Sequence, residues 1–169
     1  MIEDLSQGDY IALQAELDRF VKNHLPLGQA MGLEVSHYDA KSIALSAPLA
    51  LNDNDKGTAF GGSLYCSAVM AAWSFFYLRC LQYNLKEGMP NIVVSKGEIE
   101  YLAPVTSSNI IATCENTDKT MWDEFLARYE QKGSAKVCLS STINSEVNGV
   151  EQVAVKFTGT YALIGYSST

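Results

Sequence analysis

The feature that most constrains the fold of this chain is an apolar segment, residues 64–81, entered directly from a pair of glycines, Gly61 and Gly62. The segment carries a single charge, Arg79. Its length is at the lower limit for a membrane span, but it contains polar residues, and strands are predicted close behind it. A helix that is apolar on all sides is also typical of one enclosed by protein. We therefore predict a long helix buried inside a domain.

Composition limits the possible classes of protein. The 169 residues are 47% hydrophobic and 18% charged, which predicts one domain over residues 1–169, with the first eight residues flexible. The net charge is -7 and no basic run is present, so nucleic acid and anionic membranes are poor partners. Residues 1–9 contain acids where a signal peptide has a basic and then an apolar block. These features predict a cytoplasmic protein.

Cysteine and histidine usage gives no sign of a metal or redox centre. The four cysteines form no CxxC pair and each lies in an apolar run, so we expect buried, reduced thiols: Cys66, Cys80, Cys114 and Cys138. His24 and His37 have no partner at metal-ligand spacing. No dinucleotide, Walker or GxSxG motif is present. We expect no cofactor and no metal.

Periodicity predicts the remaining elements. Two amphipathic helices are expected at 9–24 and 121–131, and strands at 33–35, 43–49, 92–102, 109–114, 135–143 and 151–164. Pro26 is expected to end the first helix, Gly133 to cap the last one, and a loop to follow the long helix at 88–90. Asn148-Gly149 is a strong hairpin signal. Since an antiparallel sheet needs one face covered, we predict an α+β fold: a curled antiparallel sheet wrapped around a long central helix, with a short N-terminal helix and a small inserted helix.

A candidate site lies where the central helix begins. A polar loop, residues 52–58, precedes the two glycines. Paired glycines let another group approach the backbone closely. The first N–H groups of a helix have no acceptor within the helix and carry partial positive charge. The pattern is therefore typical of a site for an anion or for an oxyanion that develops during a reaction.

This loop and helix start also resemble a known family. The residues that carry the resemblance are Asn52, Asn54, Gly57, Thr58, Phe60, Gly61, Gly62 and Ser63. With the segment 100–105 and the inserted helix around Trp122, they are similar to the hotdog-fold thioesterases, in particular to the thioesterase domain at the C-terminus of YiiD-type acyltransferases. The resemblance runs from about residue 17 to 163, and we expect a stand-alone form of that domain.

The resemblance implies acyl-thioester chemistry on a coenzyme A or acyl-carrier-protein substrate, with coenzyme A or phosphopantetheine as part of the substrate. It also implies a homodimer or a dimer of dimers, with the site at the subunit interface. By analogy, the Gly61 or Gly62 amide donates to the thioester carbonyl oxygen. Pairing of strand 92–102 with its two-fold copy would protect a sheet edge.

The chain departs from the best-known hotdog thioesterases in two places. They have His-Gly-Gly at the helix start and an acid within the helix, but here Phe60 takes the histidine position, and the acid would fall near Val69, which cannot act as nucleophile or base. Asn54 takes the position of a loop amide. Because His24 and His37 both lie outside this motif, no usable histidine is present there, which argues against the hotdog dehydratases. Further candidates for chemistry nearby are Asp53, Asp55, Ser63, Cys66 and Ser67, together with Ser95 or Glu98 from the following strand.

Each candidate also has a purely structural interpretation. Residues 52–55 are turn formers, because their side chains can bond their own backbone. Thr58 and Ser63 are suited to cap a helix. Cys66 is more often a small core residue than a nucleophile, because a reactive thiolate needs a base or a positive field. The glycines can serve close packing, and Phe60 is suited to the core or to the wall of an acyl pocket.

Our hypothesis is thioester hydrolysis over the helix start. Catalysis is assigned to Asn54, Asp53, Gly61, Gly62 and Ser67, with Asn54 orienting the carbonyl or the water and Asp53, Asp55 or a partner residue as base. Substrate binding is assigned to Asn52, Thr58, Phe60, Ser63, Cys66, Met70 and Trp73, the acyl chain lying along Phe60, Met70 and Trp73. Two alternatives remain open. One is a non-catalytic acyl-binding or scaffold domain, and the other is an acyl-transfer partner in fatty-acid synthesis.

Overall fold

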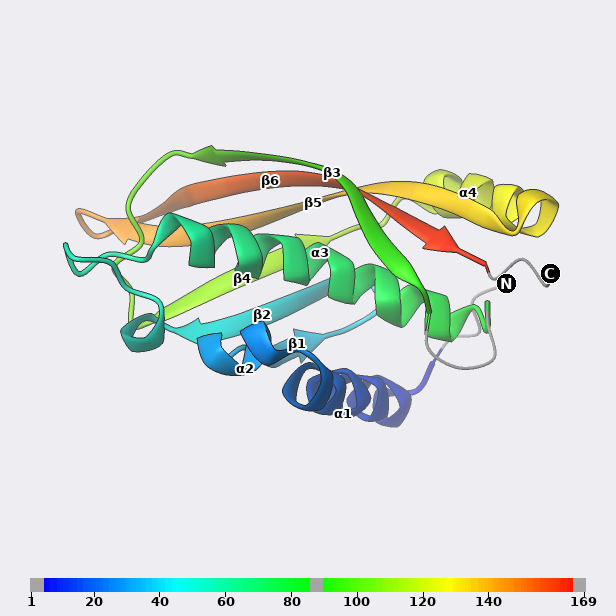
Figure 1. Cartoon of the computed structure of the whole chain (residues 1–169), viewed down its shortest axis with the longest axis horizontal. Helices are drawn as coiled ribbons and strands as arrows, with labels where there is room; N and C mark the ends of the chain where they lie inside the picture. The colour runs from blue at the N-terminus through cyan, green and yellow to red at the C-terminus, as the bar shows by residue number, and fades with distance from the viewer. Residues whose placement is uncertain (1–4, 86–89, 166–169) are drawn as a thin grey trace.

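A single curled sheet of six antiparallel strands holds the long helix α3 (Gly61–Gln82) against its inner face, as a computed structural model describes for residues 5–85 and 90–165 (Figure 1). The strand order is β1-β2-β4-β5-β6-β3. The strands are β1 (Glu34–Tyr38), β2 (Ser42–Pro48), β3 (Ile92–Tyr101), β4 (Asn109–Glu115), β5 (Ser134–Val147) and β6 (Val150–Ile164). The predicted α+β architecture, a curled sheet around a central helix, is confirmed.

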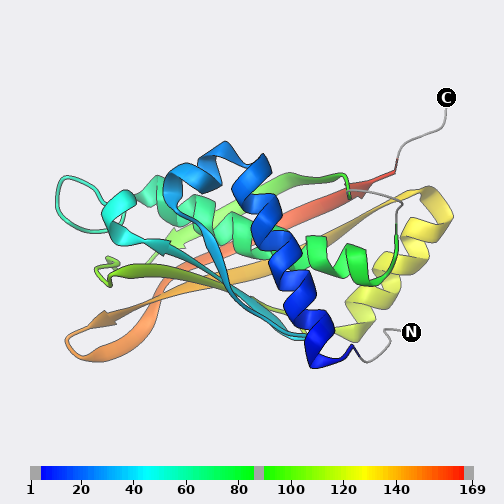
Figure 2. The same ribbon diagram turned by 90° about the horizontal axis from the view of Figure 1, so that it is seen from below.

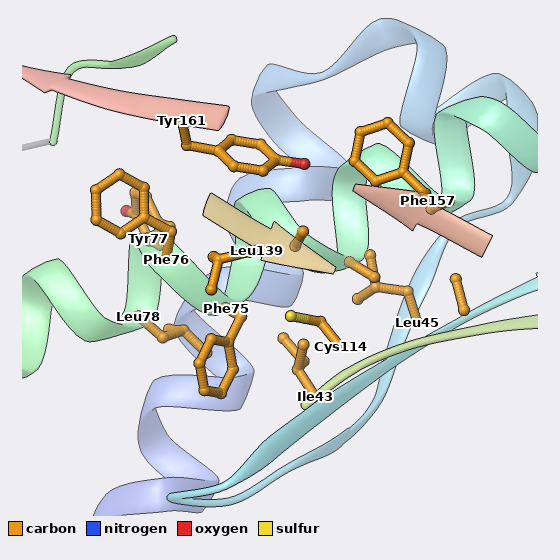
Figure 3. Close-up of a cluster of buried hydrophobic side chains, with 14 of the residues drawn as sticks. Ile43, Leu45, Phe75, Phe76, Tyr77, Leu78, Cys114, Leu139, Phe157 and Tyr161 are labelled. Atoms are coloured by element: carbon orange, nitrogen blue, oxygen red, sulfur yellow. The ribbon is translucent and has the colours of Figure 1, made fainter. Parts of the chain in front are cut away.

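Helix α3 is the centre of the core. It packs against β2, β3, β4, β5 and β6. Phe75, Phe76 and Leu78 are fully buried, and Figure 3 shows them among side chains of β2, β4, β5 and β6. By length and composition the helix could cross a membrane, but 67% of its most apolar window is buried inside the protein. The prediction of a helix enclosed by protein is confirmed.

Buried and exposed side chains alternate along the longest strands, and this pattern explains how the sheet covers α3. In β5 every second side chain from Ala135 to Ile143 is buried, because successive residues of a strand point to opposite faces. Two inward hydroxyls add polar contacts to this packing. Ser141 Oγ donates to the carbonyl of Ala68 at 2.7 Å, and Tyr161 Oη donates to the carbonyl of Val69 at 2.8 Å. The sheet is thereby bonded to the middle of α3.

The alternation of buried and exposed side chains in β5 also shows that the prediction for Cys138 was wrong. Cys138 was expected to be buried with the other cysteines, but it is exposed because it lies on the outward face of β5. Cys80 and Cys114 are buried as predicted, and Cys66 is half-buried. All four are free thiols.

Helices α1 (Gln7–His24), α2 (Pro26–Met31) and α4 (Lys119–Lys132) complete the fold. Figure 2 shows α1 crossing α3, and α4 packs on β5. Helix α1 begins within the first eight residues, because Ser6 and Asp9 form a capping box. Helix α2 was not predicted. Pro26 starts it after ending α1, and Gly32, at a φ of 65°, terminates it.

Most other element boundaries lie within a few residues of the predictions. Strand β1 is longer than expected and runs to Tyr38, so the turn begins at Asp39, whose carboxylate accepts from the amides of Lys41 and Ser42. The hairpin between β5 and β6 is confirmed, with both Asn148 and Gly149 at positive φ. Gly133 caps α4 in the left-handed conformation as predicted. The predicted loop residues 88 and 89 lie outside the described residues.

The edge strand β3 carries exposed apolar side chains towards both of its ends and exposed charged side chains, Lys96 and Glu98, in its middle. Strand β3 pairs only with β6 among the described strands, and most of its side chains are exposed. Val93, Val94 and Tyr101 are each at least 40% exposed, and Leu102 follows at 54%. A long edge strand with unpaired backbone groups and exposed apolar side chains is a surface that can pair with another chain.

Candidate functional site

The start of α3 offers three free backbone amides. Phe60 is the N-cap residue and provides no side-chain hydrogen bond to them. The first helical N–H groups, those of Gly61, Gly62 and Ser63, have no hydrogen-bond acceptor in the described part of the chain. Such groups carry the positive end of the helix dipole and suit a negative oxygen atom. Ser63 was considered as a helix cap, but it forms no capping bond because it lies inside the first turn.

The loop before α3 is held by its own hydrogen bonds. Asn52 is buried, and its amide nitrogen donates to the carbonyls of Met31 and Pro48, each at 2.8 Å. The backbone carbonyl of Asn52 accepts from the N–H of Phe60 at 2.8 Å. Ala59 N–H donates to the carbonyl of Val105 at 2.8 Å. Asn52 thus fixes the position of Phe60, the N-cap residue of α3.

Asn54 organises the tip of this loop. Its amide nitrogen donates to Thr58 Oγ1 at 2.9 Å, and its Oδ1 accepts from Lys56 N at 2.8 Å and Thr58 N at 3.3 Å. These contacts match the turn-forming interpretation of Asn54 and explain why Thr58 follows it at this spacing. Gly57, at a φ of 72°, lets the chain reverse between them. Asp53 and Asp55 are exposed on the same loop.

Strand β3 supplies a contact that the sequence did not predict. Tyr101 Oη donates to the carbonyl of Gly61 at 3.0 Å, so an exposed tyrosine lies against the first turn of α3. Partial burial of the hydroxyl raises the pKa of Tyr101, and a tyrosine hydroxyl is in any case protonated, and so able to donate, at neutral pH. The resemblance covered the segment 100–105, but nothing in the sequence pairs Tyr101 with Gly61. That pairing depends on the position of β3 beside α3.

A half-buried stripe continues from the amides along α3. Cys66, Met70 and Trp73 share one helical face, because residues four and three positions apart lie on the same side of a helix. Trp73 Nε1 donates to the carbonyl of Ile92 at 3.5 Å, which joins the stripe to the start of β3. Phe60 is 56% exposed at the head of the stripe, so it lies outside the core of this chain. Three of the residues predicted to bind substrate, Cys66, Met70 and Trp73, therefore lie on one face of α3, and the Phe60 ring lies against Gly62 at its start.

Ser67, which was predicted to be catalytic, does not lie on the half-buried face of α3. It is fully buried, its hydroxyl has no hydrogen-bond partner in the described part of the chain, and it faces away from the exposed stripe. From the following strand, Ser95 Oγ donates to the carbonyl of Thr160, and Glu98 pairs with Lys96 at 2.7 Å. Among the described residues, Tyr101 contacts Gly61 directly, and Cys66 lies within the first two turns of α3. Trp73 is about 18 Å further along the helix from Gly61, and Ser67 lies beneath the surface.

The architecture defines the class of protein: a curled antiparallel sheet wrapped around one long helix is the hotdog fold. Over residues 14–165 the chain matches the family described as "Putative thioesterase (yiiD_Cterm)", and it belongs to that family. The expected family resemblance is confirmed.

Solved structures agree with this assignment. A protein of unknown function from Chlorobaculum tepidum is 40% identical, with a TM-score of 0.83 over 91% of this chain and 95% of that one. A protein from Shewanella oneidensis described as a putative thioesterase is 25% identical, with a TM-score of 0.77 over 91% and 99% of the two chains. A thioesterase from Haemophilus influenzae shares the fold at 15% identity, with a TM-score of 0.67 over 98% and 96%.

We predict that Cys66 is a slow nucleophile. Burial raises the pKa of its thiol, and no basic side chain pairs with it in the described part of the chain. Alkylation with iodoacetamide at neutral pH, followed by peptide mass spectrometry, should label exposed Cys138 first and Cys66 more slowly. Cys80 and Cys114 should stay unlabelled, since burial raises the pKa of Cys114 to about 12. Labelling of Cys66 ahead of Cys138 would instead indicate an activated thiolate.

Proposed function

We propose that the protein hydrolyses an acyl thioester of coenzyme A or of an acyl carrier protein at the N-terminus of α3. The observation that carries the proposal is the set of three amides at Gly61, Gly62 and Ser63, which have no acceptor in the described residues and open onto an exposed apolar surface. Membership of the thioesterase family supports the same chemistry.

In the proposed reaction the thioester carbonyl oxygen accepts from the Gly61 or Gly62 amide. Water attacks the carbonyl carbon, and its proton passes to Asp53, Asp55 or a carboxylate of the partner subunit. The tetrahedral oxyanion is stabilised by the amides, which are held in place before the reaction begins. Collapse breaks the carbon–sulfur bond and releases a thiolate and a carboxylic acid. Because a thiolate is a stable leaving group, no general acid is needed.

The acyl chain has an apolar path in this proposal. Phe60, Met70 and Trp73 lead away from the amides along one face of α3. The Trp73 ring is itself stacked on Tyr77 and Phe20, at centroid distances of 5.1 and 5.7 Å, so it forms a fixed wall. Aromatic surface of this kind suits a hydrocarbon chain.

One observation favours the alternative of a non-catalytic acyl-binding domain. No histidine stands in the sequence at the start of α3, and no acidic residue stands near Val69, where the better-known enzymes have the helix acid. The amides alone would then bind the thioester carbonyl without activating water. Thiol release from a panel of acyl-CoAs of increasing chain length separates the two functions, because the binding domain gives binding in calorimetry without turnover. An acyl-transfer partner would release thiol only when an acceptor is added.

The protein is further proposed to act as a homodimer joined through β3. Strand β3 contacts the start of α3 through Tyr101 and the half-buried stripe through Ile92, so a second copy paired along β3 would cover both. Two-fold pairing of identical edge strands is self-complementary and removes the open edge.

Replacing Gly61 by proline tests the oxyanion contact directly. Proline lacks an N–H but fits the first position of a helix, and Phe60, at φ -65° and ψ 133°, already has the conformation that precedes proline. We expect kcat/KM for acyl-CoA to fall by about 10²–10³-fold if this amide polarises the carbonyl.

Gly61→Ala is the matched control, because it keeps the N–H. Its added Cβ would lie 3.7 Å from the Tyr101 ring, an ordinary contact. We expect it to retain most of the activity. Equal activity of the proline and alanine variants would remove the Gly61 amide from the mechanism and leave that of Gly62.

Two substitutions of Asn54 separate a structural from a direct role. Asp can still accept from the amides of Lys56 and Thr58, whereas Ala cannot. Because the side chain of Asn54 is occupied within the loop, we expect Asn54→Asp to keep activity within a few-fold and Asn54→Ala to lower kcat by about 10-fold. Equal, large losses of kcat in both variants would show that the amide group itself contacts the substrate.

The dimer is tested by sedimentation at micromolar protein concentration. A Val94→Glu substitution would bury a carboxylate of each copy in the proposed interface in place of an exposed apolar side chain, so we expect it to shift the protein towards the 18.5 kDa monomer. Ile111→Glu places the same change on an exposed residue of β4 and should leave the dimer intact. A monomeric wild-type protein, or a Val94→Glu dimer of unchanged strength, would contradict the proposal.

A further inference from the structure

The opposite end of α3 holds a buried arginine. Arg79, in the last turn, is only 5% exposed. Its Nη2 donates to the carbonyl of Ala40 and its Nη1 to Gln82 Oε1 at 3.2 Å, whereas Nε is buried and has no hydrogen-bond partner in the described residues. No carboxylate lies within ion-pair distance of Arg79 in the part of the chain that the structure describes. The buried cation therefore has no counter-ion there.

The guanidinium is fixed in place by aromatic rings. Its central carbon lies 5.1 Å from the Phe75 ring centroid and 5.7 Å from that of Trp122. Cation–π contacts contribute to holding such a group, but they do not replace a counter-ion. Taking an unpaired charge out of water is costly, so buried charges are normally paired or bound to a ligand.

Arg79 lines a cavity of about 510 Å³ between the end of α3, the start of α4 and the turn between β1 and β2. Tyr83, Trp122 and Leu126 supply apolar walls. Around them, Lys41 and Lys119 contribute two more cations, and Asp123 contributes one carboxylate. This cationic excess stands out in a chain with a net charge of -7.

This cavity is separate from the proposed thioester site. Arg79 follows Gly61 by 18 positions on a continuous helix, which corresponds to about 27 Å along its axis. None of its lining residues is among those placed at the start of α3. The inference is therefore independent of the proposed hydrolysis.

We propose that this cavity binds a small organic anion, a carboxylate or phosphate carried on a flat apolar body. The anionic group lies among Arg79, Lys41 and Lys119, and the apolar body packs against Tyr83 and Trp122. Arginine suits both groups because its planar guanidinium donates several hydrogen bonds. A volume of about 510 Å³ accommodates a ligand of this class.

Calorimetry provides the first test, with benzoate and phenyl phosphate as probes and benzamide as the neutral control. Tryptophan fluorescence of a Trp73→Phe variant, in which Trp122 is the remaining tryptophan, provides a second readout. We expect saturable binding of at least one anion at millimolar concentration and none of benzamide. The stronger of the two anions identifies the class of ligand as carboxylate or phosphate. Binding of benzamide as strong as that of the anions, or no binding of either anion, would overturn the proposal.

Variants then locate the site. Arg79→Gln should weaken binding by about 10-fold or more, with circular dichroism checking that it folds. Lys119→Ala changes an exposed side chain and should weaken binding by about 3-fold, whereas Asp123→Asn should strengthen it. Lys132→Ala, exposed on the same helix but outside the cavity, is the matched control and should have no effect. Equal affinities for the Lys119 and Lys132 variants would place the bound anion elsewhere.

Discussion

Burial of α3 by the curled sheet is the interaction on which the rest of the structure depends. The helix is apolar on nearly all sides, so it is stable in water only if protein surrounds it. Five strands do so, and Phe75, Phe76 and Leu78 contribute fully buried side chains to the core. Each buried side chain of this size stabilises the fold by roughly 1.5–3 kcal/mol, before the conformational entropy of ordering is counted. The hydroxyls of Ser141 and Tyr161 add direct bonds from the sheet to the helix.

Fixing α3 also fixes its two ends, and each has a distinct chemistry. At the N-terminus the loop from Asn52 to Phe60 leads into the helix and provides no side-chain cap. The amides of Gly61, Gly62 and Ser63 therefore have no acceptor among the described residues. At the C-terminus Arg79 lies close to the negative end of the helix dipole, which favours a cation there. The same helix thus presents backbone donors at one end and a side-chain cation at the other. The proposed thioester chemistry and the proposed anion site follow from these two ends.

Much of the fold could be predicted, because the signals were local and periodic. The buried helix, the hairpin at Asn148-Gly149 and the cap at Gly133 all depend on residues close in sequence. Two features were not predicted correctly, helix α2 and the exposure of Cys138, and each has a physical cause. Helix α2 has only six residues, Pro26–Met31, fewer than two turns, so it is too short to show a hydrophobic period. Cys138 lies in an apolar run but points outward, because the sheet face that a strand buries depends on what packs against it.

In the candidate site, too, some features were set by local sequence and others by the tertiary structure. The sequence by itself determined that glycines would open an apolar helix after a polar loop, since helix starts and turns are set by local backbone preferences. Only the tertiary structure decided that Asn54 bonds within its own loop, that Tyr101 reaches Gly61, and that Ser67 lies beneath the surface. It alone brought Arg79 beside Lys41 and Lys119 in one cavity. These contacts join residues far apart in the chain or depend on which face of a helix is covered, and neither is encoded in a local pattern.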